Sequence, residues 1–168
     1  MPNDSIAPTL QRSAEKDSAS GGADHTDFNK NKRRAQNMDK NWIRPLFIIA
    51  GSYDAILGVV FLFFASDIFQ WFGVEPPNHL AYVKFPALLL LIFGAMFFRV
   101  ASDPAKNREL ILYGVGLKVA YSGTTFWYQI TQGIPFMWVP WAWADLGFLV
   151  LFLIAWKSLA PASGTPSR

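Results

Sequence analysis

The sequence predicts an all-α fold: a four-helix transmembrane bundle with a disordered cytoplasmic N-terminal tail. Three features support this prediction, namely four long apolar segments, basic residues gathered in alternate connections, and a polar tail. Residues 1–40 hold 13 of the 27 charged side chains of this 168-residue chain, and the rest is largely apolar. The length suits one compact domain. We therefore expect a tail over 1–41, a transmembrane domain over 42–157 and a short C-terminal tail over 158–168.

Four segments have the length needed to cross a bilayer. About 20 apolar residues, each rising about 1.5 Å, cross a hydrocarbon core of roughly 30 Å. The predicted spans are about residues 45–65, 82–101, 110–130 and 134–156. A soluble helical bundle would need a polar stripe on each helix, and segments such as "LFIIAGSYDAILGVVFLFFA" have almost none. The pattern therefore favours membrane spans.

Local signals mark where the spans begin. Pro45 and Pro86 stand at the start of the first and second spans, where a helix loses nothing by lacking a backbone N–H. Asp103 followed by Pro104 is typical of an N-cap and first turn, here leading into the third helix. Only a few residues, "TQG", separate the third and fourth spans. That short loop predicts that these two helices are antiparallel neighbours.

The longest connection between spans is residues 66–81, "SDIFQWFGVEPPNHLA". Its apolar front half is expected to form a short interfacial helix on the outer surface, containing Ile68, Phe69, Trp71 and Phe72. Residues 76–77, both proline, then turn the chain toward the second span. An alternative is that this segment covers a cavity from outside.

Basic residues indicate how the spans are oriented. They gather before the first span, between the second and third, and after the fourth, whereas the opposite side has only Lys84. The positive-inside rule therefore places both termini and the middle loop in the cytoplasm. Tryptophans near the predicted boundaries are consistent with aromatic belts: Trp42, Trp156, Trp71, Trp127, Trp138 and Trp141.

The composition narrows the chemistry. The chain has no cysteine, which excludes disulfides, thiol catalysis and Cys-ligated metal sites, and its two histidines, His25 and His79, lie far apart in the sequence. We find no nucleophile–His pair and no Gly-rich phosphate loop, so no catalytic residue, metal ligand or cofactor is predicted. The tail cluster "NKNKRR" either fixes topology or attracts anionic lipid headgroups. It is too short to predict nucleic-acid binding.

Three charged residues fall near the bilayer midplane. Counted from the inner end of each span, Asp54 lies about 14 Å deep, Lys118 about 12 Å and Asp145 about 17 Å. A charge facing lipid there would cost at least about 2.5–3.5 kcal/mol. We therefore expect all three to face inward, with Lys118 paired to one or both aspartates.

Helical periodicity predicts the inward faces of three spans. The third span carries a polar stripe of Gly114, Lys118, Tyr121, Ser122 and Thr125. The first has a face of small residues that would let a neighbour approach closely: Ala50, Gly51, Asp54 and Gly58. The fourth contributes Trp138, Trp141, Ala142, Asp145, Phe148 and Leu149. The candidate polar interior site is therefore Asp54, Lys118, Tyr121, Ser122, Thr125, Trp141 and Asp145.

The residues leave different functions open. In one interpretation the interior site binds a small molecule or relays protons, since ionisable groups inside membranes often mark such sites. In another, the ion cluster only fixes helix register in an accessory subunit of a larger membrane complex or a homo-oligomer. A third is a redox partner that contacts quinone through aromatic residues. In each case the lipid bilayer is the first partner.

The stretch "NRELILYGVGLKVAYSG", entering a polar third helix after a long first outer connection, resembles the DoxX-like small four-helix bacterial membrane proteins. The resemblance covers about residues 42–157 and rests on architecture. It implies a multi-pass protein of the bacterial inner membrane. Some of these proteins are linked to thiol or sulfur-compound oxidation and quinone-coupled electron transfer. No family residues map onto this chain, and its lack of cysteine argues against thiol redox chemistry.

Overall fold

The computed structural model describes Phe28 and residues 41–160, and the folded unit begins at Trp42. Within these residues every regular element is helical, which confirms the predicted all-α class. The elements are α2 (Ile43–Trp71), α3 (Ala81–Ser102), α4 (Leu110–Thr131), the short 3-10 helix η1 (Phe136–Trp138) and α5 (Val139–Ser158). The predicted disordered tail and most of the C-terminal tail lie outside the described residues.

Three helical stretches are long and apolar enough to cross a membrane: α2, α3 and the stretch Phe136–Ser158 that joins η1 to α5. Helix α4 is not among them, although its 22 residues make it as long as α3. It is less apolar, because its sequence includes the polar stripe around Lys118.

Helix α2 is longer than predicted. Its 29 residues correspond to about 43 Å, which exceeds the hydrocarbon core. The helix is interrupted at Phe64, where the backbone is non-helical (φ −116°, ψ 19°), and then continues to Trp71. The segment expected to form a short interfacial helix is helical and follows this interruption, as the last part of α2. Its Phe69 is buried and meets the Trp138 ring edge-on at 6.1 Å between centroids, so this segment packs back onto η1.

A Schellman motif ends α2. Gly73 adopts a positive φ of 62°, its N–H donates to Gln70 O at 3.1 Å, and Val74 N–H donates to Phe69 O at 2.9 Å. Glycine reaches this left-handed conformation without the penalty of a β-carbon. The glycine thus sets the end of the helix.

The prediction that Asp103 caps the third helix is wrong. Helix α4 begins at Leu110, and residues 103–109 form a turn before it. Asp103 Oδ1 accepts a hydrogen bond from Lys106 N–H at 3.1 Å, so its carboxylate caps this turn instead. Pro86 also lies inside α3 rather than at its start, because the helix begins at Ala81. The proline is the sixth residue of α3, so it removes the backbone hydrogen bond that residue 86 would otherwise donate to Tyr82 O.

Helices α2 and α3 form one closely packed hairpin. A β-carbon built at Gly51 would lie 3.0 Å from Gly94 O, and one at Gly94 would lie 3.0 Å from Gly51 O. A turn or two further along, a β-carbon at Gly58 would lie 2.8 Å from Ala87 O. Only residues without side chains allow the backbones to approach this closely. The predicted small face of the first span is therefore confirmed.

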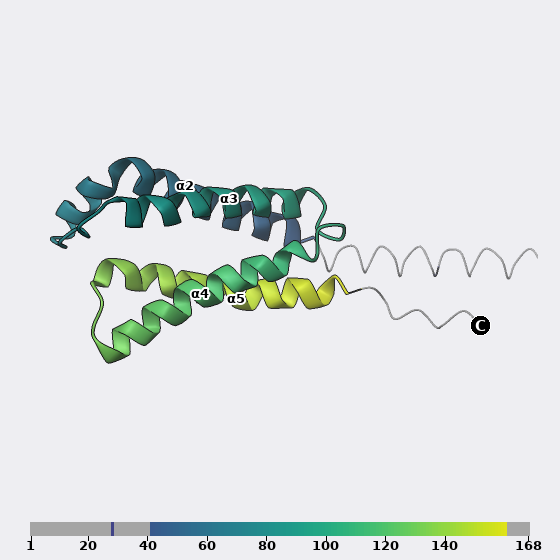
Figure 1. Cartoon of the computed structure of the whole chain (residues 1–168). Helices are drawn as coiled ribbons and strands as arrows, with labels where there is room; N and C mark the ends of the chain where they lie inside the picture. Colours follow the sequence, from purple (N-terminus) through teal and green to yellow (C-terminus); the bar gives the residue numbers. More distant parts are fainter. Residues whose placement is uncertain (1–27, 29–40, 161–168) are drawn as a thin grey trace, which may run out of the picture. The chain divides into compact units, whose positions relative to one another are not determined.

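Helices α4 and α5 form the second hairpin, drawn from green to yellow in Figure 1. In the connection between them, Gly133 adopts a positive φ of 76° and Pro135 is extended. The short helix η1 follows and leads into α5. Aromatic packing joins the two helices where Phe126 meets Trp143 in a T-shaped contact, with 4.9 Å between the ring centroids. The predicted antiparallel pairing of the last two helices is confirmed.

One buried cluster joins both hairpins at the end where α2 and α4 begin. At its centre, Phe47 stacks on Phe152 at 4.7 Å, and Phe97 meets Phe152 edge-on at 5.0 Å. All four long helices contribute to it: Ile43, Leu46, Phe47, Ala50, Phe97, Val100, Ala101, Ile111, Phe152 and Ala155. A second, smaller cluster includes Phe61 and Met137. Asp54 lies along α2 between these two apolar clusters.

Candidate functional site

The Lys118 ammonium group lies between two carboxylates from different helices. Its Nζ donates a hydrogen bond to Asp54 Oδ1 at 2.7 Å and lies 2.9 Å from Asp145 Oδ1. The second contact has ion-pair distance but not hydrogen-bond geometry, so Asp54 is the more directed partner. The prediction that Lys118 pairs with one or both aspartates is confirmed, since it forms ion pairs with both. It links α4 to α2 in the other hairpin and to α5 in its own.

Aromatic rings surround the same ammonium group. The ring centroids of Tyr53, Phe148 and Phe97 lie 5.1, 5.6 and 5.8 Å from Lys118 Nζ. Aromatic faces within about 6 Å attract a cation, and more strongly where water is excluded. These rings occupy space that water would need in order to solvate the charge.

The cluster is sealed from solvent. Lys118 and Asp54 are 0 % exposed, and Asp145 is 5 % exposed. A buried ionic cluster is tolerated only when its charges are paired, because each unpaired ion would carry a desolvation penalty of several kcal/mol. Two carboxylates and one ammonium leave one excess negative charge when all are ionised. Asp54 Oδ2 is buried without a hydrogen-bond partner among the described residues.

The other members of the predicted polar stripe bind elsewhere. Tyr121 Oη donates to Trp138 O at 3.1 Å, and Ser122 Oγ donates to Ala142 O at 3.1 Å. Thr125 is buried on the same face of α4. These hydroxyls were expected beside the charges, but Tyr121 and Ser122 instead hold α4 to the backbone of η1 and α5. Trp141 is half-buried, and its ring lies 6.1 Å from the Tyr53 ring.

Sequence reasoning missed the aromatic part of this cluster. Phe97 comes from α3, which brings no charge to the site, and Tyr53 directly precedes Asp54. The centroid of the Tyr53 ring lies 5.3 Å from that of Phe148. A usable signal was present, because a buried lysine attracts aromatic neighbours and Tyr53 stands beside one of its predicted partners.

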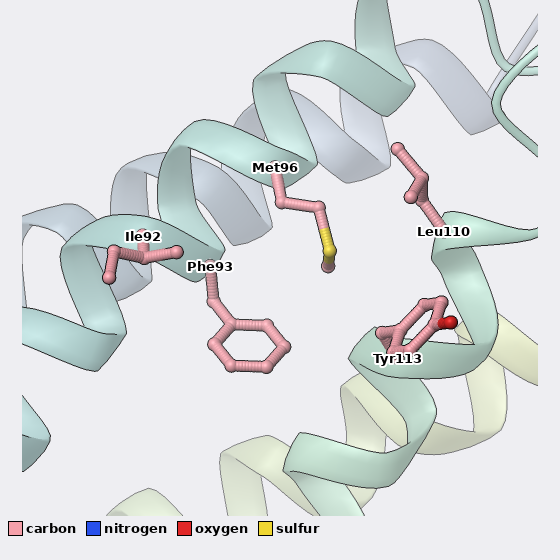
Figure 2. Close-up of a pocket in the computed structure, with 5 residues that line it drawn as sticks. All are labelled: Ile92, Phe93, Met96, Leu110 and Tyr113. Carbon is pink, nitrogen blue, oxygen red and sulfur yellow. The ribbon is translucent and has the colours of Figure 1, made fainter.

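An open pocket of about 250 Å³ lies apart from the charges. Figure 2 shows it between α3 and α4, lined by Ile92, Phe93, Met96, Leu110 and Tyr113. None of the three charged residues lines it. The pocket therefore offers no route to Lys118.

Comparison with known proteins gives no relative: no model of a protein family, no curated protein and no solved structure matches the sequence.

Proposed function

We propose that the chain is a four-span protein of the bacterial inner membrane that acts as an accessory or assembly subunit, packing α4 against a partner helix. The observation that carries this proposal is the outward face of α4. Gly116 and Gly123 have open space where a side chain would stand, and the face is completed by exposed small residues: Gly116, Ala120, Gly123 and Thr124. Small residues of this kind let two membrane helices pack closely.

The exposed surface elsewhere is mostly large and apolar. On the other helices it includes Ile56, Phe63 and Ile92, which are 63, 70 and 64 % exposed, and on α4 itself large exposed side chains such as Val119, Trp127 and Ile130 border the small residues. Large apolar side chains suit contact with acyl chains, whereas the small face of α4 gives acyl chains little to pack against. The small residues Gly116, Ala120 and Gly123 therefore favour protein rather than lipid at this part of α4.

The buried pairing supports α4 as a fourth span despite its polar content. Its one charge, Lys118, is paired with Asp54 and Asp145 and is fully buried. Its buried polar residues Ser122 and Thr125 lie on the same inward side. Contacts inside the protein thus lower the free-energy cost of placing these polar groups in the bilayer, and none of them needs to face lipid.

The packing also supports an orientation with both termini in the cytoplasm. The cluster around Phe47 joins the start of α2, the end of α3, the start of α4 and the end of α5. Basic residues lie at these four helix ends: Arg44, Arg99, Lys106, Arg108 and Lys157. The opposite end has Lys84 alone among the described basic residues. The positive-inside rule assigns the basic end to the cytoplasm.

In this proposal the ion cluster has a structural role. Charges from two hairpins meet in a sealed interior, which fixes the rotation of α4 and therefore the direction of its small outward face. Buried ionic groups are known to specify register in this way. The architectural resemblance to DoxX-like proteins agrees with a small inner-membrane subunit and remains a proposal.

Site-specific cross-linking in membranes tests the proposal. A photoreactive phenylalanine analogue at Ala120 should form a protein adduct, whereas the same analogue at Ile56 of α2 should not. An adduct of twice the chain mass would identify a second copy, and any other mass a different partner. The adduct should disappear when Gly123→Ile fills the small face. Absence of protein adducts at Ala120, or equal adducts at both positions, would contradict the proposal.

A second function is favoured by one observation: Asp54 Oδ2 is buried and has no hydrogen-bond partner in the part of the chain that the structure describes. An acceptor in this position suits a midplane site that binds a proton or a small polar molecule. Proton flux into liposomes loaded with a pH-sensitive dye distinguishes the two functions. A relay requires flux in the wild type that is lost in the folded triple variant Asp54→Asn, Lys118→Met, Asp145→Asn. An accessory subunit gives no flux in either protein.

A further inference from the structure

The pocket between α3 and α4 lies close to the turn that connects them. Leu110, the first residue of α4, is one of its walls, and Met96 lies on the last two turns of α3. Figure 1 shows α4 diverging from α3 beyond this turn. The pocket therefore occupies the space where the two hairpins begin to separate.

The lining is suited to a hydrocarbon chain. In Figure 2 the side chains of Phe93 and Met96 extend from α3 into the space beside Leu110 and Tyr113 of α4, and Ile92 lies along α3 next to Phe93. All five are apolar or aromatic, and the only side-chain polar atom they carry is the Tyr113 hydroxyl. Ile92 and Tyr113 are 64 and 66 % exposed, so the pocket opens outward. In a bilayer such an opening faces acyl chains.

Unpaired basic groups stand at the turn end of the pocket. Arg99 follows Met96 by three residues and Ile92 by seven, which places it on the same face of α3, about 4.5 Å along the axis from Met96. Arg99 and Lys106 form no ion pair among the described residues. Arg108 is engaged, because it pairs with Glu109 and donates to Trp156 O.

The turn also orders the backbone beside Arg99. Asn107 Nδ2 donates to Arg99 O at 3.0 Å and to Asp103 O at 2.9 Å, which holds the turn over the end of α3. The turn includes the acidic residues Asp103 and Glu109. Asp103 Oδ1 accepts from the backbone of Lys106, and Glu109 pairs with Arg108, so neither carboxylate forms an ion pair with Arg99.

From this arrangement we propose that the pocket binds one anionic phospholipid, with an acyl chain between α3 and α4 and the phosphate at Arg99 and Lys106. The inference rests on the proposed membrane location but not on the proposed helix partner, which would contact α4 further along the helix, from Gly116 to Thr124. Arg99 supplies a planar donor pair suited to a phosphate group. An apolar pocket and a nearby basic pair together match both halves of such a lipid.

Native mass spectrometry of the purified full chain in detergent tests the inference. The probes are phosphatidylglycerol and phosphatidylcholine with identical acyl chains, added in a concentration series. We expect one phosphatidylglycerol to remain bound at lower concentration than phosphatidylcholine. Arg99→Gln should weaken phosphatidylglycerol binding about fivefold, since one basic residue near a phosphate contributes on that scale. It should leave phosphatidylcholine binding unchanged.

Two further variants separate the pocket from a general lipid coat. Lys84→Gln removes an exposed basic residue from the other end of α3, about 22 Å from Arg99, and should change nothing. Ile92→Trp places a larger ring in the pocket at an exposed position and should weaken binding of both lipids. Equal effects of Arg99→Gln and Lys84→Gln, or unchanged binding in Ile92→Trp, would overturn the inference.

The experiment distinguishes an incorrect lipid site from an incorrect membrane location. A chain that remains folded and monodisperse without detergent would contradict the membrane location itself. A detergent-dependent chain that binds both lipids alike would contradict only the lipid site. Thermal unfolding of each variant in the same detergent confirms that the compared proteins are folded.

Discussion

Phe97 of α3 lies against Gly114 of α4, so close that a β-carbon at Gly114 would stand 2.5 Å from Phe97 Cε1. The Phe97 ring is fully buried, and its centroid is 5.8 Å from Lys118 Nζ, one turn further along α4. The missing side chain at Gly114 therefore allows a helix without intramembrane charge to help enclose the ammonium group. The contact also joins the two hairpins directly.

The variant Gly114→Ala should destabilise the fold. The added methyl group would force Phe97 to move, and Phe152 lies only 3.1 Å from the same point, so the ring has little room. Overpacking of this kind costs about 1–3 kcal/mol of the free energy of unfolding. Unfolding in mixed micelles measures it, and Phe97→Leu in the same chain should recover part of the loss.

Gly116→Ala is the matched control on the same helix. No atom lies within 4 Å of a β-carbon there, so stability should be unchanged or higher by at most about 1 kcal/mol. A loss at Gly116 equal to that at Gly114 would contradict the role of the Phe97 contact, because the added methyl group at residue 116 meets no side chain and alanine is the better helix former.

Removal of the buried cation alone should be severe. Lys118→Met would leave Asp54 and Asp145 buried side by side without a positive partner, which costs about 3–5 kcal/mol. Neutralising all three residues, as Asp54→Asn, Lys118→Met and Asp145→Asn, should recover most of that loss. The measurement is protein yield in membranes together with the melting temperature in detergent. A triple variant as unstable as Lys118→Met would show that the ionic contacts themselves, beyond charge balance, maintain the fold.

The two aspartates should not be equivalent. Asp54 is 0 % exposed and accepts the directed hydrogen bond at 2.7 Å, whereas the Asp145 contact at 2.9 Å lacks hydrogen-bond geometry. Asp145→Asn would leave a balanced Lys118–Asp54 pair. We therefore expect Asp54→Asn to cost about 1–2 kcal/mol more than Asp145→Asn. The reverse order in the same unfolding assay would mean that Asp145 is the principal partner.

The sequence predicted the elements whose signals are local. The second span was expected over 82–101 and α3 covers Ala81–Ser102, because an uninterrupted apolar run between basic residues defines its length. The predicted end of the first span at residue 65 coincides with the interruption at Phe64, and the helical segment that follows continues until a residue stops it. That residue is Gly73, with its positive φ, and its Schellman motif was a readable signal.

The charged part of the site was predictable and its surroundings were not. The cost of charges at one depth required Lys118 to meet the aspartates, whatever the details of packing. Contact with Phe97 depends on the rotation of α3, and no polar residue in that span marks its inward face. Helical periodicity predicted that the hydroxyls of Tyr121 and Ser122 lie on the same face of α4 as Lys118, and they were therefore assigned to the charges. They lie about one turn further along α4 than Lys118, where they donate to backbone carbonyls of η1 and α5 instead.

The Ser122 hydroxyl should stabilise the α4–α5 hairpin modestly. Ser122→Ala removes the hydrogen bond that the hydroxyl donates to the buried Ala142 O. The loss should lower the free energy of unfolding by about 0.5–1.5 kcal/mol. Thr131→Ala is the control, because the Thr131 hydroxyl donates only to Trp127 O within its own helix and is exposed. An equal loss of stability in Thr131→Ala and Ser122→Ala would show that the hydrogen bond between α4 and α5 does not contribute to stability.

Arg108 joins the start of α4 to the end of α5 through two contacts with a single residue. Its Nε donates to Trp156 O at 2.9 Å, and its guanidinium carbon lies 4.2 Å from the centroid of the Trp156 ring. Lysine retains the charge, but it has no flat guanidinium group that could stack on the ring while a nitrogen bonds the carbonyl. Arg108→Lys should therefore lose about 1–2 kcal/mol of stability in detergent. Lys106→Ala, in the same turn but without an ion pair among the described residues, should be neutral. If Arg108→Lys were also neutral, positive charge alone would account for the role of Arg108 at this end of the bundle.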